Sequence, residues 1–233
     1  MKIINLFTKK IVKTEGPLTL REVNRLIRNR TKITNKEFSH GYDLIKKYPH
    51  SVSILGSARF KSDNEYYKKA ESLGRRIAQE LKCAVVTGGG PGIMEAANKG
   101  AFQAGGKSIG FAIKLPREQE VNPYLTEFVE FEYFFSRKTL LFFSAETYVY
   151  YPGGFGTMDE LFEILTLIQT GEIPRVPVVL VGRDFWQPLL DLIKEDLLVN
   201  EQTINLEDTY IYKIVDSEDE IIDIIKNAPF RQE

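Results

Sequence analysis

Two glycine-rich runs constrain the fold of this chain more than any other feature, because each follows an apolar strand-like segment and precedes a helix-like one. The first run, TGGGPG at residues 87–92, follows the apolar residues 84–86, and the second, YPGGFGT at residues 151–157, follows the apolar stretch from Thr147. In an open parallel sheet, the loops at the carboxyl ends of the strands share one edge. We therefore expect both runs to face one ligand. For either loop alone, a tight turn that packs a helix against a strand explains the glycines equally well.

The chain after Ser51 continues this pattern. Short β-rich runs alternate with segments of helical periodicity, which is typical of a parallel sheet covered by helices on both faces. The segment 65–81, for example, places Ala70, Leu73 and Ile77 at helical spacing. The expected strands are 52–55, 84–87, 108–113, 127–133, 147–151 and 176–181, with a further one at 209–215. The sequence thus predicts an α/β fold with an open parallel sheet in residues 51–233.

Composition favours a small-molecule ligand over a macromolecular one. The chain has 233 residues and a formal net charge of −1, which gives no broad electrostatic reason to bind nucleic acid or an anionic membrane. No segment approaches the roughly 20 apolar residues of a membrane span, so we expect a cytoplasmic protein. The lone Cys83 excludes an internal disulfide, and His40 and His50 have no partner at metal-ligand spacing. No metal or other cofactor is expected.

Residues 1–50 form a separate region that we expect to be a helical extension. Apolar residues from Leu18 to Ile27 are interleaved with arginines from Arg21 to Arg30, as in an amphipathic helix. The extension is expected to dock on the core or on another subunit. Its arginines could contact nucleic acid, but a solvated helix face is the commoner meaning of such a run.

The helix expected after the second glycine run has an unusually wide apolar face. Its stripe runs from Met158 to Ile168, and Ile164 and Leu167 extend it around the helix. A face this wide needs more cover than one side of a sheet provides. We therefore expect a homodimer with this helix at the interface. Burial under the N-terminal extension is the alternative.

The second glycine run has the features of a phosphate cradle with an acid beside it. Gly153, Gly154 and Gly156 let backbone N–H groups approach an anion closely, and the start of the following helix adds unpaired donors and a partial positive charge. We expect Glu160 to lie in the first turn of that helix. Because Glu160 is three residues after Thr157, an alternative is a capping box in which Glu160 holds a backbone N–H of its own helix.

Two adjacent cations, Arg137 and Lys138, stand between the glycine runs, where a β-rich segment turns into a helical one. Cations are electrostatically disfavoured at a helix N-terminus, so the pair suggests an anionic partner. Arg137 can make a bidentate contact with a carboxylate or phosphate, whereas Lys138 acts as a point charge. The alternative is ordinary helix-start charge.

These motifs together resemble the "lonely guy" (LOG) family of nucleoside 5′-monophosphate phosphoribohydrolases, often labelled lysine decarboxylases. The family signature is an Arg-Lys pair followed by Pro-Gly-Gly-x-Gly-Thr-x-x-Glu, which stands here as Arg137-Lys138 and residues 152–160. Gly56-Ser57 and the loop with Gly89 and Gly90 also match, and the resemblance covers about residues 51–197. One departure is Ala145-Glu146, where Ser-Asp is often found, and this puts the preferred base in doubt.

The resemblance implies a Rossmann-like fold and hydrolysis of the N-glycosidic bond of a purine or cytokinin nucleoside 5′-monophosphate, releasing the base and ribose 5-phosphate. Arg137 and Glu160 match the catalytic pair. The implied substrate-binding residues are Gly56, Ser57, Gly89, Gly90, Lys138, Gly153, Gly154, Gly156 and Thr157. Two alternatives are a molybdenum cofactor carrier that binds without turnover and a nucleotide-sensing regulator that hydrolyses poorly.

Overall fold

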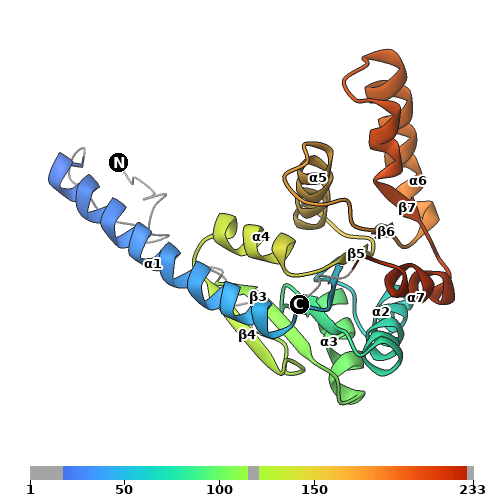
Figure 1. The fold of residues 1–233 in the computed structure, drawn as a ribbon, viewed down its shortest axis with the longest axis horizontal. Coiled ribbons are helices and arrows are strands. Elements are labelled where there is room, and N and C mark those ends of the chain that lie inside the picture. The colour runs from blue at the N-terminus through green and yellow to red at the C-terminus, as the bar shows by residue number, and fades with distance from the viewer. Residues whose placement is uncertain (1–17, 115–120, 230–233) are drawn as a thin grey trace.

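Residues 18–114 and 121–229 are described by a computed structural model, and their strands form one seven-stranded parallel sheet (Figure 1). Its order is β4-β3-β2-β1-β5-β6-β7, and every neighbouring pair is parallel. The strand bounds are β1 Ser51–Leu55, β2 Ala84–Thr87, β3 Ser108–Ile113, β4 Glu127–Phe131, β5 Thr147–Tyr150, β6 Val178–Leu180 and β7 Tyr212–Ile214. The predicted α/β fold with an open parallel sheet is confirmed. Several strands are shorter than predicted at one or both ends.

Helices cover both faces of this sheet. Their bounds are α1 Leu20–Lys47, α2 Glu65–Arg76, α3 Ile93–Gln103, α4 Phe134–Phe143, α5 Phe155–Gln169, α6 Arg183–Leu192 and α7 Glu218–Lys226, with short helical segments η1 Ile77–Leu81, η2 Ile193–Asn200 and η3 Leu206–Tyr210. Helices α1, α4, α5 and the start of α6 contribute to one apolar cluster, and α2, α3 and α7 contribute to the other. The sheet therefore lies between two helical layers.

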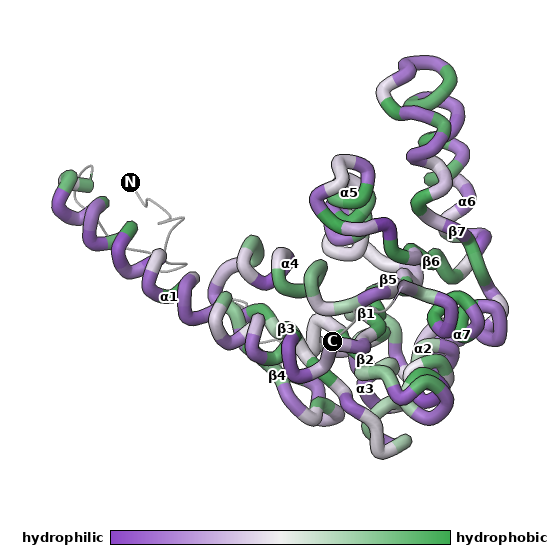
Figure 2. Tube along the Cα trace, in the orientation of Figure 1, coloured by the Kyte–Doolittle hydropathy of each residue, from purple (hydrophilic) through white to green (hydrophobic). Residues whose placement is uncertain are grey.

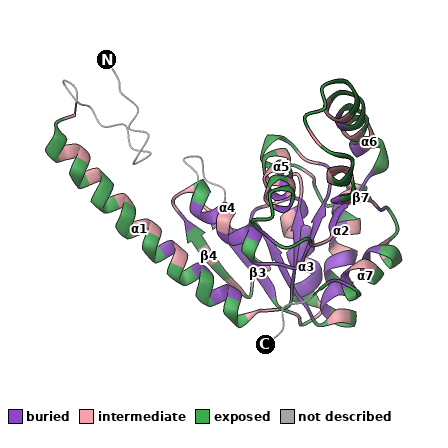
Figure 3. Ribbon diagram, turned by 45° about the horizontal axis from the view of Figure 1, so that its top comes forward, coloured by how far each residue is buried: buried purple, intermediate pink, exposed green. Residues whose placement is uncertain are grey.

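The period-2 alternation of strand side chains explains how one sheet serves two cores. Leu55 and Tyr150 join the cluster under α4 and α5, while Ile54 and Val149 join the cluster under α2 and α3. The central strands are apolar on both faces and buried (Figure 3). Figure 2 shows the same arrangement as hydrophobic strands inside helices whose colours alternate between hydrophobic and hydrophilic.

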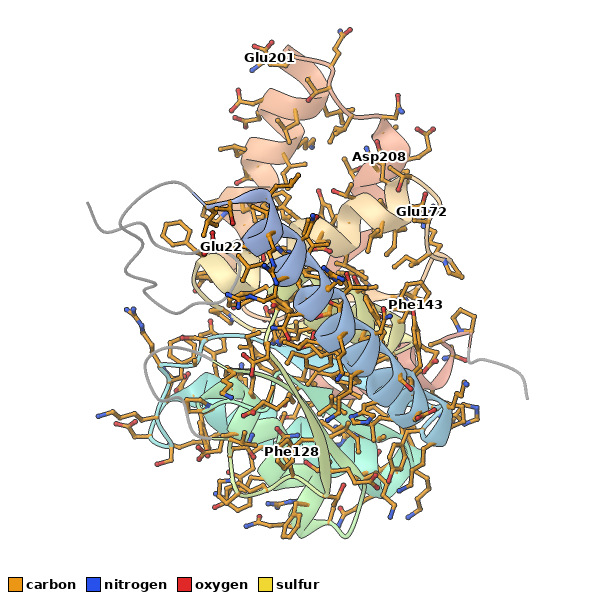
Figure 4. All side chains as sticks on the ribbon, turned by 90° about the vertical axis from the view of Figure 1, so that its left-hand side faces the viewer. Glu22, Phe128, Phe143, Glu172, Glu201 and Asp208 are labelled. Carbon is orange, nitrogen blue, oxygen red and sulfur yellow. The ribbon has the colours of Figure 1, made fainter. Side chains whose placement is uncertain are left out.

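Two elements extend beyond this core. Helix α1 begins with a capping box between Thr19 and Glu22 and continues to Lys47, well past the apolar stretch that predicted it. Its C-terminal half packs on α4, where Gly41 is so close to Leu140 that an added Cβ would overlap that side chain. Its N-terminal half is mostly exposed (Figure 3). On the far side of the molecule, α6 and η2 form a second projection that carries Glu201 (Figure 4).

The order of the strands determines where a ligand can bind. From β1 the chain proceeds to β2, β3 and β4 on one side and then crosses to β5 on the other side of β1. A crevice forms outside the carboxyl ends of the strands at such a switch point. The loops that border it here follow β1 and β5, and they are joined by a hydrogen bond from the Ser57 N–H to the Pro152 carbonyl (3.0 Å). Among the residues described, no helix is long and apolar enough to cross a membrane.

Candidate active site

A cavity of about 640 Å³ opens at the switch point between β1 and β5. Eight of the predicted site residues line it, namely Gly56, Ser57, Arg137, Gly153, Gly154, Gly156, Thr157 and Glu160. They come from the loops after β1 and β5, from the first turn of α4 and from the first two turns of α5. The structure thus brings together most of the predicted site, and the roles of these residues remain predictions.

Arg137 and Glu160 form a nearly buried ion pair in the wall of this cavity. The Arg137 Nη1 is 2.8 Å from the Glu160 Oε1, and the two side chains are only 8% and 13% exposed. The Arg137 Nε donates to the Phe111 carbonyl at the end of β3 (2.8 Å), so the guanidinium is fixed from two directions. Its second Nη lies against Gly88, where any Cβ would overlap it. Because solvent hardly reaches this charge-assisted pair, its hydrogen bonds hold both side chains in one orientation.

Glu160 lies in the second turn of α5, which corrects the expectation that it would lie in the first. The N-cap is Gly154 and the helix begins at Phe155, so Glu160 is the sixth helical residue. The capping-box alternative is wrong, because α5 has no side-chain cap and the Glu160 carboxylate is bound to Arg137. Its second oxygen, Oε2, accepts no hydrogen bond from the described residues. One carboxylate oxygen is therefore available to the cavity.

Tyr150 fixes the backbone of α5 at this point. Its hydroxyl donates to the Glu160 carbonyl (3.0 Å), which links the end of β5 to the second turn of the helix. Burial raises the pKa of Tyr150 well above the usual value, and the Glu160 charge adds to this shift. The phenol consequently stays protonated and keeps its role as a donor.

The turn from Gly153 to Thr157 leaves open space beside its backbone. The first bond of α5 runs from the Met158 N–H to the Gly154 carbonyl (3.0 Å), so the preceding amides have no partner within the helix. A Cβ on Gly154 or Gly156 would meet nothing within 4 Å, whereas one on Gly153 would overlap the Thr157 side chain. Gly153 is thus needed for packing, and Gly154 and Gly156 leave room for an anion to reach the helix N-terminus.

Only part of the first glycine run faces the cavity, although we expected the whole run to face the ligand. Gly88 lines the cavity, but Gly89 and Gly90 do not. Their carbonyls accept hydrogen bonds from the backbone N–H and the Nδ2 of the buried Asn122, at 2.9 and 3.1 Å. The described part of the segment 114–126 therefore packs against this run, and residues 115–120 lie outside the described residues.

Lys138 also lies outside the cavity lining, although it follows Arg137 directly. Its ammonium binds Asp159 (2.8 Å) and Glu163 on α5, so it joins α4 to α5. Partial burial tends to lower the pKa of Lys138, but the two carboxylates outweigh that effect and raise it. Consecutive residues on a helix point about 100° apart, which explains why only one of the two cations reaches the cavity.

The cavity also contains residues that the sequence did not single out as site residues. Arg59 lies on its rim, and its backbone N–H donates to the Ser57 Oγ (3.1 Å). Phe134 and Phe155 are 50% and 97% exposed beside it, and Met94 completes one wall. Phe134 and Phe155 could have been predicted from the sequence, because they are the first residues of α4 and α5, and helices that begin at this edge of the sheet face the crevice.

This arrangement combines three chemical elements. Open backbone amides at the start of α5 suit a phosphate or other anion. A carboxylate oriented by an arginine can stabilise positive charge or accept a proton. Exposed aromatic rings at the rim can pack against a planar group. An anionic ligand with a planar end and a reaction centre between the two would use all three.

Comparisons with known proteins agree with this geometry. The family described as "Possible lysine decarboxylase" matches residues 94–225. A cytokinin riboside 5′-monophosphate phosphoribohydrolase from Rhodococcoides fascians is 29% identical over 151 residues, which are 63% of this chain and 75% of that protein. The rice (Oryza sativa subsp. japonica) cytokinin riboside 5′-monophosphate phosphoribohydrolase LOG is 32% identical over 149 residues, 63% of this chain and 60% of the relative.

Solved structures show the same fold. The molybdenum cofactor binding protein of Rippkaea orientalis is 26% identical, with a TM-score of 0.53 over 76% of this chain and 93% of the other.

The family match to residues 94–225 spans more than half of the 233 residues and includes the Arg137–Glu160 pair and the second glycine run. With the relatives named phosphoribohydrolases, it shows that this chain belongs to the LOG family, the one also described as possible lysine decarboxylases.

Proposed function

We propose that this protein hydrolyses the N-glycosidic bond of a purine nucleoside 5′-monophosphate, giving the free base and ribose 5-phosphate. The observation that carries the proposal is one cavity that holds both an open anion-binding turn and an oriented carboxylate, Glu160. Binding of a phosphate alone needs no carboxylate nearby. The names of the relatives support the same reaction class.

The residues suggest how the reaction proceeds. The 5′-phosphate binds at the N-terminus of α5, against the open backbone at Gly154 and Gly156. As the bond from C1′ to the base nitrogen breaks, positive charge develops on the ribose, and the Glu160 carboxylate stabilises it. Glu160 then accepts a proton from the water that attacks C1′. Water supplies the hydroxyl on C1′ and, overall, the proton on the departing base.

Arg137 keeps the Glu160 carboxylate oriented during this step. Its Nη1 holds Oε1 at 2.8 Å and leaves Oε2 toward the reaction. The Arg137 Nε–H also donates to the Phe111 carbonyl, and this second hydrogen bond keeps the guanidinium, and the carboxylate bound to it, from rotating out of the cavity wall. The two residues therefore act as one unit, and removal of either has an effect similar to removal of both.

The principal alternative is a carrier that binds a phosphorylated pterin without turnover. It is favoured by the similarity in fold to the Rippkaea orientalis molybdenum cofactor binding protein. A carrier would also use the open turn at Gly154, but it has no need for the Arg137–Glu160 pair. We therefore place hydrolysis first.

The test is to incubate the purified protein with AMP and with its N6-isopentenyl analogue and to quantify free base and ribose 5-phosphate by chromatography. Stoichiometric release of both products from either nucleotide, abolished by Arg137→Ala, is the expected result. Nucleotide binding without release would favour the carrier or the regulator. The comparison of the two substrates measures the preference for the base.

We also propose that the protein forms a homodimer through α4 and α5. Five phenylalanines on these helices are 41–97% exposed, namely Phe134, Phe135, Phe143, Phe155 and Phe162, and the first residue of each helix also lines the cavity. Helix α1, in the described part of the N-terminal extension, packs on α4 and β4 and leaves Phe162 exposed. Large exposed apolar patches mark interaction sites, and we expect these side chains to form one. A monomeric mass in sedimentation at micromolar concentration would contradict the proposal.

A further inference from the structure

The N-terminal helix α1 places a buried carboxylate at the start of α4. Glu37 lies on α1, is only 6% exposed, and is separated by about one hundred residues from the groups that it contacts. Its Oε1 accepts the backbone N–H of Glu132, and its Oε2 accepts the Ser136 Oγ–H, each at 2.5 Å. Charged side chains are seldom buried without such partners. Both carboxylate oxygens are directed at one short segment, the turn from β4 into α4.

Helix α4 lacks the usual stabilisation of its own N-terminus. Its N-cap, Tyr133, makes no side-chain cap bond, and its first turn contains no acidic residue. It carries Arg137 as its fourth residue instead, although a cation is disfavoured at the positive end of a helix. The Glu37 carboxylate places an acidic side chain from α1 beside this N-terminus, where it accepts from the Glu132 N–H just before the helix and from the Ser136 hydroxyl in its first turn.

A second contact from α1 holds the same turn. The guanidinium carbon of Arg30 lies 4.9 Å from the ring centre of Tyr133 and 5.2 Å from that of Phe135. Arg30 is seven residues before Glu37, two helical turns away on the same face of α1. Together, the two side chains bind the turn 132–136 on both its aromatic and its polar groups. The docking of α1 therefore combines these contacts to one turn with the apolar packing of Leu44 and Ile45 in the core.

This turn carries two groups that reach the cavity. Phe134 lies within it, and Arg137 follows Ser136 directly. On its cavity side, Arg137 is fixed by Phe111 and Glu160. On its other side, the backbone that bears it is fixed by Glu37 through Ser136 and Glu132. The position of the guanidinium therefore depends on α1 as well as on the catalytic domain.

We propose that Glu37 is a positioning residue that sets the place of Arg137, so that the N-terminal extension is part of the active-site machinery. The proposal rests on the proposed function for its kinetic consequence, but its structural part does not. An ångström-scale displacement of a catalytic group lowers rates by about 100-fold. Because the anion-binding turn at Gly154 belongs to a different loop, substrate binding is expected to change much less than turnover.

The experiment compares three variants of the full chain. Glu37→Ala removes both acceptors, Glu37→Gln keeps the shape and one acceptor, and Asp43→Asn removes an exposed carboxylate on the same helix as a matched control. For each variant, kcat and KM for AMP are measured. In ¹⁵N-labelled protein, the side-chain Nε–H signal of Arg137 is also recorded, after assignment by its loss in Arg137→Lys. This signal reports the Phe111 hydrogen bond without any need for activity.

We expect Glu37→Ala to lower kcat by about 10- to 100-fold with less than a threefold change in KM, and to shift or broaden the Arg137 signal. Glu37→Gln should recover part of both effects, and Asp43→Asn should match the wild type. An unchanged Arg137 signal together with an unchanged kcat in Glu37→Ala would overturn the proposal. An equal loss in Asp43→Asn would also overturn it, because the effect would then be general to α1.

Two further outcomes separate this proposal from the proposed function. If Glu37→Ala does not fold, Glu37→Gln decides by the same two readouts. If the wild type hydrolyses no nucleotide, the proposed function fails, and the Arg137 signal alone then supports or overturns the role of Glu37.

Discussion

Replacement of Glu160 by glutamine is the most direct test of the chemistry. Glu160→Gln removes the negative charge but keeps the side-chain shape, and the amide oxygen can still accept from the Arg137 Nη1, which is 2.8 Å from Oε1 in the native pair. The fold should therefore tolerate the change. The loss is confined to the charge that stabilises the developing positive ribose and accepts the proton.

The magnitude follows from the burial of the site. The Glu160 side chain is 13% exposed, so the interaction between its charge and a cation about 4 Å away is described by an effective dielectric constant of about 20, which gives about 4 kcal/mol. Each 1.36 kcal/mol is a factor of ten in rate, so the electrostatic loss alone is about 10³-fold in kcat. Loss of the proton acceptor adds to it. KM for AMP should change little, because the proposed phosphate site is at another loop.

The assay is the release of free base and ribose 5-phosphate from AMP, with circular dichroism and thermal unfolding to confirm the fold. Asp159→Asn is the matched control, since this neighbouring carboxylate pairs with Lys138, is 59% exposed and does not line the cavity. It should retain activity within a few-fold of the wild type. A Glu160→Gln enzyme within tenfold of the wild-type kcat would refute the electrostatic reasoning.

The remaining predictions concern packing and titration. Gly153→Ala should destabilise the protein by about 1–3 kcal/mol in denaturant unfolding, because its Cβ would overlap Thr157, whereas Gly154→Ala should keep the unfolding midpoint and raise KM for AMP. Lys138→Met should lower the free energy of unfolding, because it removes the ion pairs that raise the pKa of Lys138. In denaturant unfolding, this loss relative to the wild type should be fully present below about pH 10.4 and should decline as the pH rises through the folded-state pKa. A loss that stays constant with pH would contradict the ion pairs. Burial, and to a smaller extent the Glu146 charge, raise the pKa of Cys83 to about 11, so at pH 8 it should react with a thiol reagent more than 100-fold more slowly than free cysteine.

The layers of the fold followed from the sequence because local patterns determine them. Short β-rich apolar runs and segments with helical periodicity alternate after Ser51, and a parallel sheet covered by helices on both faces is the arrangement that satisfies both. The location of the cavity also followed, since loops at the carboxyl ends of strands meet at one edge. The pairing of Arg137 with Glu160 needed a resemblance to a family, because residues 23 positions apart carry no local signal of contact.

Other features depended on tertiary contacts that no local pattern encodes. Glu160 lies in the second turn because α5 begins at Phe155. The sequence pattern does not fix the exact first residue of a helix, so the turn was predicted wrongly. Lys138 was predicted to bind substrate, but the carboxylates of Asp159 and Glu163 place it between two helices. Glu37 gave no signal at all, because its partners are contributed by the turn from β4 into α4.

The absence of a side chain at Gly88 determines where the charged side chain of Arg137 can lie. The volume that a methyl group would fill at this position is occupied by the guanidinium of Arg137. Gly88 therefore provides the space that the Arg137 guanidinium occupies, in addition to any contact with a ligand. A single added carbon at residue 88 would displace the guanidinium and leave the turn at Gly154 unchanged, so under the proposed function it should lower turnover more than nucleotide binding.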